Sequence, residues 1–321
     1  MDEEMGNCKE PVFPEYTWTD SEPGRRLREF LPDKFFDAHV HAGHNFGFAD
    51  YVQTMCRELP IIRDIRAMLI PMPERDITQE RRDSLNKSVT DQLNRYPGNI
   101  GESFVLPGDS CEKILAMTDH PSIRGLKCYF YSAGKANPAI DEYLPEAAWE
   151  AANRKELAIT LHLARASSLA DPEDLEYIQR MCRKYPYAKL ILAHCGRAFA
   201  AWTCQESVKQ LRGIDNLYYD LSAICESVPM YYCLKFAGSD HVLWGSDHPI
   251  SNFQGKAISV GGGFAWVKGD AIEGCGTTAP AMTVLQENLL AVYTAADMLE
   301  LSAGEVECIF YGNMCELFCV R

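Results

Sequence analysis

The sequence lacks the features that mark several protein classes. Its longest stretch without a charged side chain runs only from Gly274 to Gln286, whereas a membrane-spanning helix needs about 20 apolar residues. Residues 1–10 are acidic and contain no apolar core of a secretory signal. No run of five or more basic residues occurs, and 31 Lys and Arg against 45 Asp and Glu give a net charge of −14, which disfavours contacts with nucleic-acid phosphates. We therefore expect a cytoplasmic protein without membrane or nucleic-acid partners.

Disulfide, zinc-ribbon and nucleotide-binding signatures are also missing. The 13 cysteines are odd in number and form no Cys-x-x-Cys pair, so we interpret them as reduced thiols of an intracellular protein. The glycine-rich stretch 260–264 matches neither the G-x-G-x-x-G nor the G-K-[ST] phosphate-binding pattern, and we interpret it as a flexible loop.

The residues that are present predict one large α/β domain. With 321 residues, 47% of them apolar, the chain can bury a sizeable core. Residues 1–34 combine four prolines with many charges and predict an extended arm, which leaves the domain at 35–321. From residue 35, short apolar runs alternate with helical patterns, and the eight predicted strands are 35–40, 67–71, 102–106, 122–128, 158–163, 189–194, 217–221 and 241–246.

The order of these elements indicates how the strands pair. Helices are predicted after Pro145 and after the Asp171-Pro172 start signal. Alternating strands and helices indicate parallel pairing through right-handed crossovers. An open doubly wound sheet would have similar strands, but the count of eight favours a (β/α)8 TIM barrel.

Polar residues close several of the predicted strands. His39 and His41 lie two apart on the first strand, so both rings project from one face. His162 ends the fifth strand, His194 the sixth, and Asp247 follows the eighth. The carboxyl ends of parallel barrel strands meet at one mouth, where active sites lie. We expect these five side chains to converge there, and imidazoles with one carboxylate suit Zn²⁺ or Mn²⁺.

Each of these residues alone also has a structural interpretation. A single histidine is readily explained as a buried, hydrogen-bonded side chain, and Asp247 as a cap of a turn. Chance placement does not explain the set, because the chain has only 8 histidines and four of them close three strands.

The ordered set resembles the amidohydrolase superfamily, and within it the amidohydrolase-related group of hydrolases and of the 2-amino-3-carboxymuconate-semialdehyde and γ-resorcylate decarboxylases. The resemblance covers about residues 35 to 320. It rests on Phe36-Asp37-Ala38-His39-Val40-His41, Gly125-Leu126-Lys127, His162, Ala193-His194-Cys195-Gly196 and Trp244-Gly245-Ser246-Asp247-His248-Pro249. Residues 309–318 are similar to the closing helix of the group, which implies a C-terminal helical extension.

This resemblance implies a set of metal ligands. They are His39, His41, His162 and Asp247, with His194 beside the ion as a ligand in binuclear members of the group, or as a base and orienting residue in mononuclear ones. One ion is expected rather than two, and Zn²⁺ is expected ahead of Mn²⁺.

Two reactions follow from the resemblance. In hydrolysis, water activated by the metal attacks a lactone, amide or ester carbonyl that the metal or His194 polarises. Asp247 takes the proton from the water and passes it to the leaving group. In non-oxidative decarboxylation, Asp247 or His194 protonates the carbon of an aromatic or enoic acid. The leading prediction is a hydrolase of a small carbonyl compound that bears a carboxylate. A non-catalytic metal-binding barrel is a third interpretation, against which the complete ligand set argues.

Four cationic or titratable residues are predicted to bind substrate at the same mouth. Lys127 ends the fourth strand and has three interpretations: a carbamylated lysine that bridges two metals, a free ammonium that pairs with an anionic substrate, or a lysine on the surface or behind the ligands. Arg165 and Arg197 each follow a strand-ending histidine by three positions and are candidates for a substrate carboxylate or for structural bridges. His44 either reaches the substrate or is a solvated loop residue. Oligomeric state is left open, with a homodimer as an option.

Overall fold

The barrel consists of eight parallel strands that pair in chain order. The computed structural model describes residues 21–73, 77–276 and 279–320. The strands are β1 (Lys34–Ala42), β2 (Asp64–Pro71), β3 (Ile100–Phe104), β4 (Ile123–Cys128), β5 (Ala158–Leu161), β6 (Lys189–Leu192), β7 (Leu217–Asp220) and β8 (Val242–Leu243). The segment after β8 returns to β1, since the Ala38 N–H donates to the Trp244 carbonyl at 2.9 Å. The predicted (β/α)8 barrel is confirmed.

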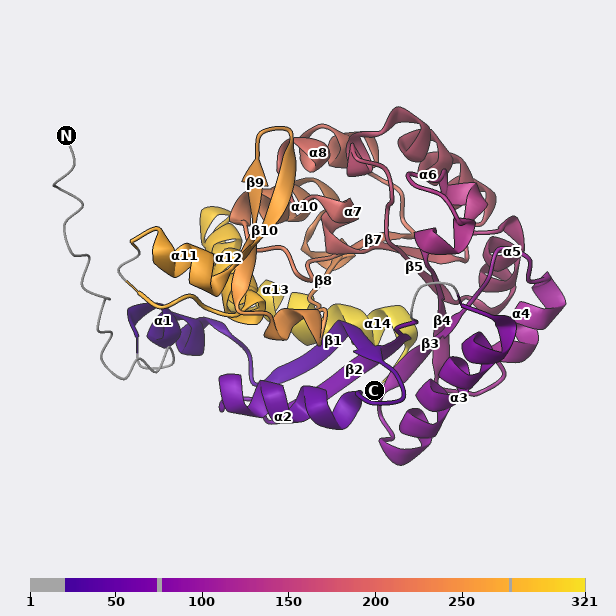
Figure 1. The fold of residues 1–321 in the computed structure, drawn as a ribbon, viewed down its shortest axis with the longest axis horizontal. Coiled ribbons are helices and arrows are strands. Elements are labelled where there is room, and N and C mark those ends of the chain that lie inside the picture. The colour runs from indigo at the N-terminus through magenta and orange to yellow at the C-terminus, as the bar shows by residue number, and fades with distance from the viewer. Residues whose placement is uncertain (1–20, 74–76, 277–278, 321) are drawn as a thin grey trace, which may run out of the picture.

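Helices follow the strands and cover the outside of the barrel (Figure 1). Those between β1 and β8 are α2 (Phe48–Glu58), α3 (Gln79–Arg95), α4 (Cys111–Met117), α5 (Glu146–Lys155), α6 (Pro172–Lys184), α7 (His194–Arg197), α8 (Trp202–Gln205), α9 (Ser207–Gln210) and α10 (Ser227–Ala237). Short helical turns are η2 (Phe130–Ala133), η3 (Ile140–Glu142), η4 (Ser168–Ala170), η5 (Ser239–His241) and η6 (Ile250–Asn252). Both predicted helices, α5 and α6, are present, and the Asp171 carboxylate caps α6.

The C-terminal helices extend the barrel, as expected, and the last of them, α14, closes its amino-terminal end. They are α11 (Gly269–Gly274), α12 (Val284–Met298), α13 (Ala303–Glu307), the π-turn η7 (Cys308–Gly312) and α14 (Asn313–Phe318). Met314, Leu317 and Phe318 of α14 join the apolar cluster inside the strands. The Lys189 ammonium, at the start of β6, donates to the Leu317 carbonyl at 2.6 Å. With this end filled, the carboxyl ends of the strands form the mouth.

Two segments differ from the sequence-based expectation. Within the predicted extended arm, residues 22–30 form helix α1 (Glu22–Phe30), because Ser21 caps it, Pro23 stands in its first turn and Leu27 is buried against the domain; residues 1–20 lie outside the described part. The glycine-rich stretch is the turn of a β-hairpin rather than a flexible loop. It joins β9 (Gly255–Val260) to β10 (Gly263–Lys268), and Gly261 has the positive φ of +56° that such a turn requires.

No helix in the described ranges is long and apolar enough to cross a membrane. The cysteines of the same ranges are all free thiols, and most are buried.

Candidate metal centre

Three of the predicted ligands meet at the mouth of the barrel. The Nε2 atoms of His39 and His41 lie 3.6 Å and 3.0 Å from Oδ1 of Asp247. Donor atoms of the three residues all lie within 4.8 Å of one another, and all three side chains are buried. The β1 pleat places both imidazoles on one face, as predicted, and the Asp247 N–H donates to the His39 carbonyl at 2.9 Å, which fixes the two segments side by side.

The chemistry of this triad fits a divalent metal. Burial lowers the pKa of His39 to about 4, despite the opposing attraction of Asp220, so the ring is neutral near pH 7. Its Nδ1 lies 2.8 Å from the Asp220 carboxylate, which as an anion can only accept a hydrogen bond there. The lone pair is therefore on Nε2, the atom that faces Asp247. Such a carboxylate–histidine pair is the usual support of a metal-binding imidazole.

Asp247 is ready to act as the anionic ligand. Burial alone would raise the pKa of Asp247, but the imidazoles of His194, His41 and His39 outweigh it and hold the value below its ordinary range. Oδ1 makes no hydrogen bond within the described part of the chain although two imidazole nitrogens face it. A cation between these three atoms would satisfy all of them.

Left-handed backbone is concentrated at this mouth. His194, Cys195 and Arg197 have φ of 56°, 54° and 59°, so the short helix α7 is a left-handed turn, and Asp247 has φ of 65°. Non-glycine residues in this region cost about 1–3 kcal/mol each and persist where the surroundings impose them, often at active sites. The fold therefore holds His194 and Asp247, which follow β6 and β8, in unfavourable backbone conformations.

The rings of His194 and His162 lie next to the triad, on the side of His39. The His194 ring stacks on that of His39, with centroids 5.1 Å apart, and the His162 ring contacts His194 edge-on at 5.2 Å. Phe130 stacks on His162 at 5.4 Å. Burial lowers the pKa of His162, so it too is a neutral imidazole, but its nitrogens are not in the compact group of His39, His41 and Asp247. Its role as the fourth ligand stays a prediction.

Lys127 is fully inside the barrel rather than on the surface. It is 1% exposed, and its ammonium lies 5.3 Å from the centre of the Tyr129 ring, whose hydroxyl in turn is 3.5 Å from His41 Nδ1. Glu102, also buried, accepts a hydrogen bond from Thr160 Oγ1 at 2.6 Å. Burial raises the pKa of Glu102 to about 8 and lowers that of Lys127. Lys127 therefore shares the interior of the barrel with a second buried ionisable group.

The two arginines make different contacts. Arg165 pairs with Asp171 at 2.6 Å and Glu173 at 2.5 Å, and its Nε lies 3.8 Å from Asp174. Arg197 Nη1 donates to the carbonyl of Arg165 at 2.8 Å, and its guanidinium lies 5.7 Å from the centre of the Phe264 ring. The contacts of Arg165 favour the structural-bridge interpretation, whereas substrate binding by either arginine remains a prediction.

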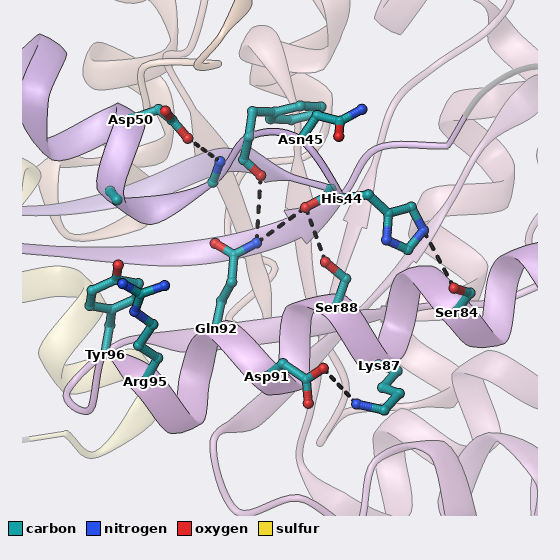
Figure 2. Close-up of a pocket in the computed structure, with 14 residues that line it drawn as sticks. His44, Asn45, Asp50, Ser84, Lys87, Ser88, Asp91, Gln92, Arg95 and Tyr96 are labelled. Carbon is teal, nitrogen blue, oxygen red and sulfur yellow. Dashed lines mark hydrogen bonds and ion pairs between the residues drawn. The ribbon is translucent and has the colours of Figure 1, made fainter.

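His44 lines an open pocket between the loop after β1 and helix α3 (Figure 2). The pocket holds about 540 Å³. His44 Nε2 lies 3.4 Å from Ser84 Oγ, and the Gln92 carboxamide accepts from the Phe48 N–H at 3.0 Å, which holds the loop against α3. His44 is thus an exposed residue beside the mouth, and its predicted contact with substrate is untested.

A family comparison decides the classification. The model of the amidohydrolase family matches residues 36–318, which is most of the barrel and all of the triad. The chain belongs to the amidohydrolase family. The resemblance found in its motifs is thereby confirmed.

Solved amidohydrolase-like structures share the fold. An amidohydrolase II is 13% identical with a TM-score of 0.56, covering 89% of this chain and 99% of its own. The 5-carboxyvanillate decarboxylase of Sphingomonas paucimobilis is 11% identical with a TM-score of 0.54, covering 90% and 100%. A Pseudomonas putida protein provisionally assigned as a 2-pyrone-4,6-dicarboxylic acid hydrolase is 13% identical with a TM-score of 0.56, covering 91% and 99%. A search of curated proteins found no match.

Sequence reasoning missed two residues of this amidohydrolase centre. Asp220 closes β7 just as His162 and His194 follow β5 and β6, so its position carried the same signal. Ser222 had no such signal, because its importance depends on the direction of one hydroxyl group.

Proposed function

We propose that this amidohydrolase-family protein is a metal-dependent hydrolase of a small lactone, amide or ester that bears a carboxylate. The observation that carries the proposal is the buried triad in which two imidazole nitrogens face one carboxylate oxygen of Asp247. His39, His41 and Asp247 would hold the ion, with His162 as the predicted fourth ligand. Zn²⁺ is the first choice and Mn²⁺ the second, with one ion per chain.

The protein's own groups have defined tasks in this proposal. When bound, the ion would polarise the substrate carbonyl and acidify water. Asp247, whose pKa the surrounding imidazoles hold low, is a carboxylate near neutral pH and can accept a proton from water and return it to the leaving group. Lys127, buried within the barrel, supplies positive charge for an anionic substrate.

Non-oxidative decarboxylation is the second candidate. It is supported by the shared fold of the 5-carboxyvanillate decarboxylase and of a 2,6-dihydroxybenzoate decarboxylase from Rhizobium, which is 12% identical with a TM-score of 0.54. Under this alternative Asp247 or His194 delivers a proton to carbon. A non-catalytic barrel is the third candidate, and the buried, correctly oriented triad argues against it.

A metal-defined screen separates these reactions. Purified protein loaded with Zn²⁺ or Mn²⁺ is incubated with carboxylate-bearing lactones, amides and esters and with aromatic and enoic acids, while acid release and CO₂ are both recorded. Hydrolysis that disappears in Asp247→Asn but persists in the exposed-surface control Asp270→Asn supports the proposal. CO₂ release lost in Asp247→Asn would replace it with the decarboxylase, and full activity of Asp247→Asn would refute both.

A further inference from the structure

One buried carboxylate at the end of β7 contacts both histidine-bearing segments. Asp220 Oδ2 lies 2.8 Å from His39 Nδ1. Its Oδ1 accepts from the N–H groups of His194 and Ser222, both at 3.0 Å, and from the Ser222 hydroxyl. An ionised carboxylate accepts about four such bonds, whereas a protonated one must use an oxygen as a donor. The three donors on Oδ1 and the imidazole nitrogen at Oδ2 are the kind of partners that an ionised Asp220 needs.

Ser222 continues this network to His194. Because its hydroxyl proton is directed to Asp220, Ser222 Oγ can only accept at His194 Nδ1, which lies 2.9 Å away. The Ser222 backbone carbonyl lies 2.9 Å from the same nitrogen and is also an acceptor. The proton of a neutral His194 is therefore on Nδ1, and the lone pair is on Nε2.

The two imidazoles are thus held in the same tautomer by the same support. Their rings are nearly parallel, with an interplanar angle of 27° and centroids 5.1 Å apart. Each ring has its Nδ1 side toward Asp220 and Ser222, so each presents Nε2 toward the opposite side, where His39 Nε2 faces Asp247.

The backbone and the packing around Asp220 and Ser222 are tightly constrained as well. His194 has a left-handed φ of 56°, and the hydrogen bond from its N–H to Asp220 holds this conformation. At Gly245 there is no room for a side chain next to His39 and Ser222, since an added Cβ would lie 2.9 Å from the His39 Cβ and 3.2 Å from the Ser222 Cβ. The elements are packed closely around this network.

We propose that Asp220 and Ser222 are positioning residues that fix His39 and His194 as a pair of Nε2 bases. His194 then enters the reaction as a Lewis base at Nε2 and not as a proton donor. This statement about the reaction rests on the proposed function, whereas the tautomers do not depend on it.

The first test is made on the metal-free protein. Long-range ¹H–¹⁵N correlation spectra of protein labelled at histidine nitrogen should show His39 and His194 with the proton on Nδ1 in the wild type. In Asp220→Asn, the His39 signal should move toward the other tautomer, because a carboxamide does not enforce a donor at Nδ1. A wild-type spectrum with the proton on Nε2 of either ring would overturn the proposal even if the protein is an active hydrolase.

The second test is the affinity for Zn²⁺, measured by competition with a chromophoric chelator. Loss of an outer carboxylate that orients a ligand weakens metal binding by about 10–100-fold, and we expect a loss in this range for Asp220→Asn and a smaller one for Ser222→Ala. Ser103→Ala is the matched control, because Ser103 is equally buried but donates to the Met117 carbonyl, away from the triad. Wild-type affinity in a folded Asp220→Asn would refute the positioning role. A wild type that binds no Zn²⁺ would refute the proposed function, while the tautomers would still decide this inference.

Discussion

Asp174 is the buried carboxylate of the cluster around Arg165, and its environment makes the stability of the domain depend on pH. It is 2% exposed, and its Oδ2 makes no hydrogen bond within the described ranges. Burial and the negative charges of Asp171 and Glu173 raise the pKa of Asp174 to about 7, and the attraction of Arg165 offsets only part of this effect. We predict that the substitution Asp174→Asn changes the free energy of unfolding, relative to the wild type, more favourably at pH 8 than at pH 5.

The sign and size follow from linkage. The folded pKa of about 7 lies above the ordinary value of 3.8, so the stability contributed by this group is complete below the ordinary value and is lost as the pH rises through about 7. Between pH 5 and pH 8 a group with these two values loses about 2.5 kcal/mol. Asparagine stays neutral throughout, so the difference in unfolding free energy between variant and wild type should change by about that amount in favour of the variant.

Urea unfolding at pH 5, 6, 7 and 8 measures this difference. A chelator is present in every sample, because bound metal would add its own pH-dependent stabilisation. The exposed-surface variant Asp270→Asn is the control and should follow the wild type. A difference between Asp174→Asn and the wild type that stays constant from pH 5 to pH 8 would show that Asp174 is ionised in the fold, and would refute the reasoning.

Three further substitutions test the supports of the site. Gly125→Ala would place a Cβ 2.7 Å from Glu102 Oε1 in the interior, so we expect a loss of about 1–3 kcal/mol in urea unfolding, and an unchanged midpoint would contradict this. Gln92→Ala removes the acceptor of the Phe48 N–H, which should cost about 1–2 kcal/mol and speed hydrogen exchange in residues 43–48; unaltered exchange would show that the contact does not hold the loop. Arg165→Met should lower stability and leave KM unchanged, because carboxylates of the chain already engage its guanidinium, and a raised KM with unaltered stability would instead support substrate binding.

The barrel and the convergence of His39, His41 and Asp247 could be predicted from the sequence. Both depend on the repeat of apolar residues along the strands and on which residues end those strands. Each predicted strand is present, and a two-residue repeat necessarily places His39 and His41 on one face. The residues that end parallel strands meet at one mouth whatever the loops do. Asp247 therefore reached the two histidines although it lies more than 200 positions away in the chain.

Contacts that depend on loop geometry could not be predicted in the same way. Arg165 was visible as a cation near the mouth, but the direction of its guanidinium toward Asp171 and Glu173 depends on the turn that precedes α6. Ser222 matters only because its hydroxyl faces Asp220 and His194 together. In the β9–β10 hairpin, the glycines suggested a loop, but the residues on both sides of them favour β-strands. The flanking residues, and not the glycines, therefore indicate the structure of this segment.

The most direct test of the central claim is the amount of metal bound per chain. Elemental analysis of protein expressed in metal-replete medium should find about one Zn²⁺ or Mn²⁺ per chain, and the ion should be lost in the His39→Asn/Asp247→Asn double variant while Ser103→Ala retains it. A folded wild-type protein with no stoichiometric metal, or a double variant that binds as much metal as the wild type, would contradict the assignment of His39, His41 and Asp247 as the metal site.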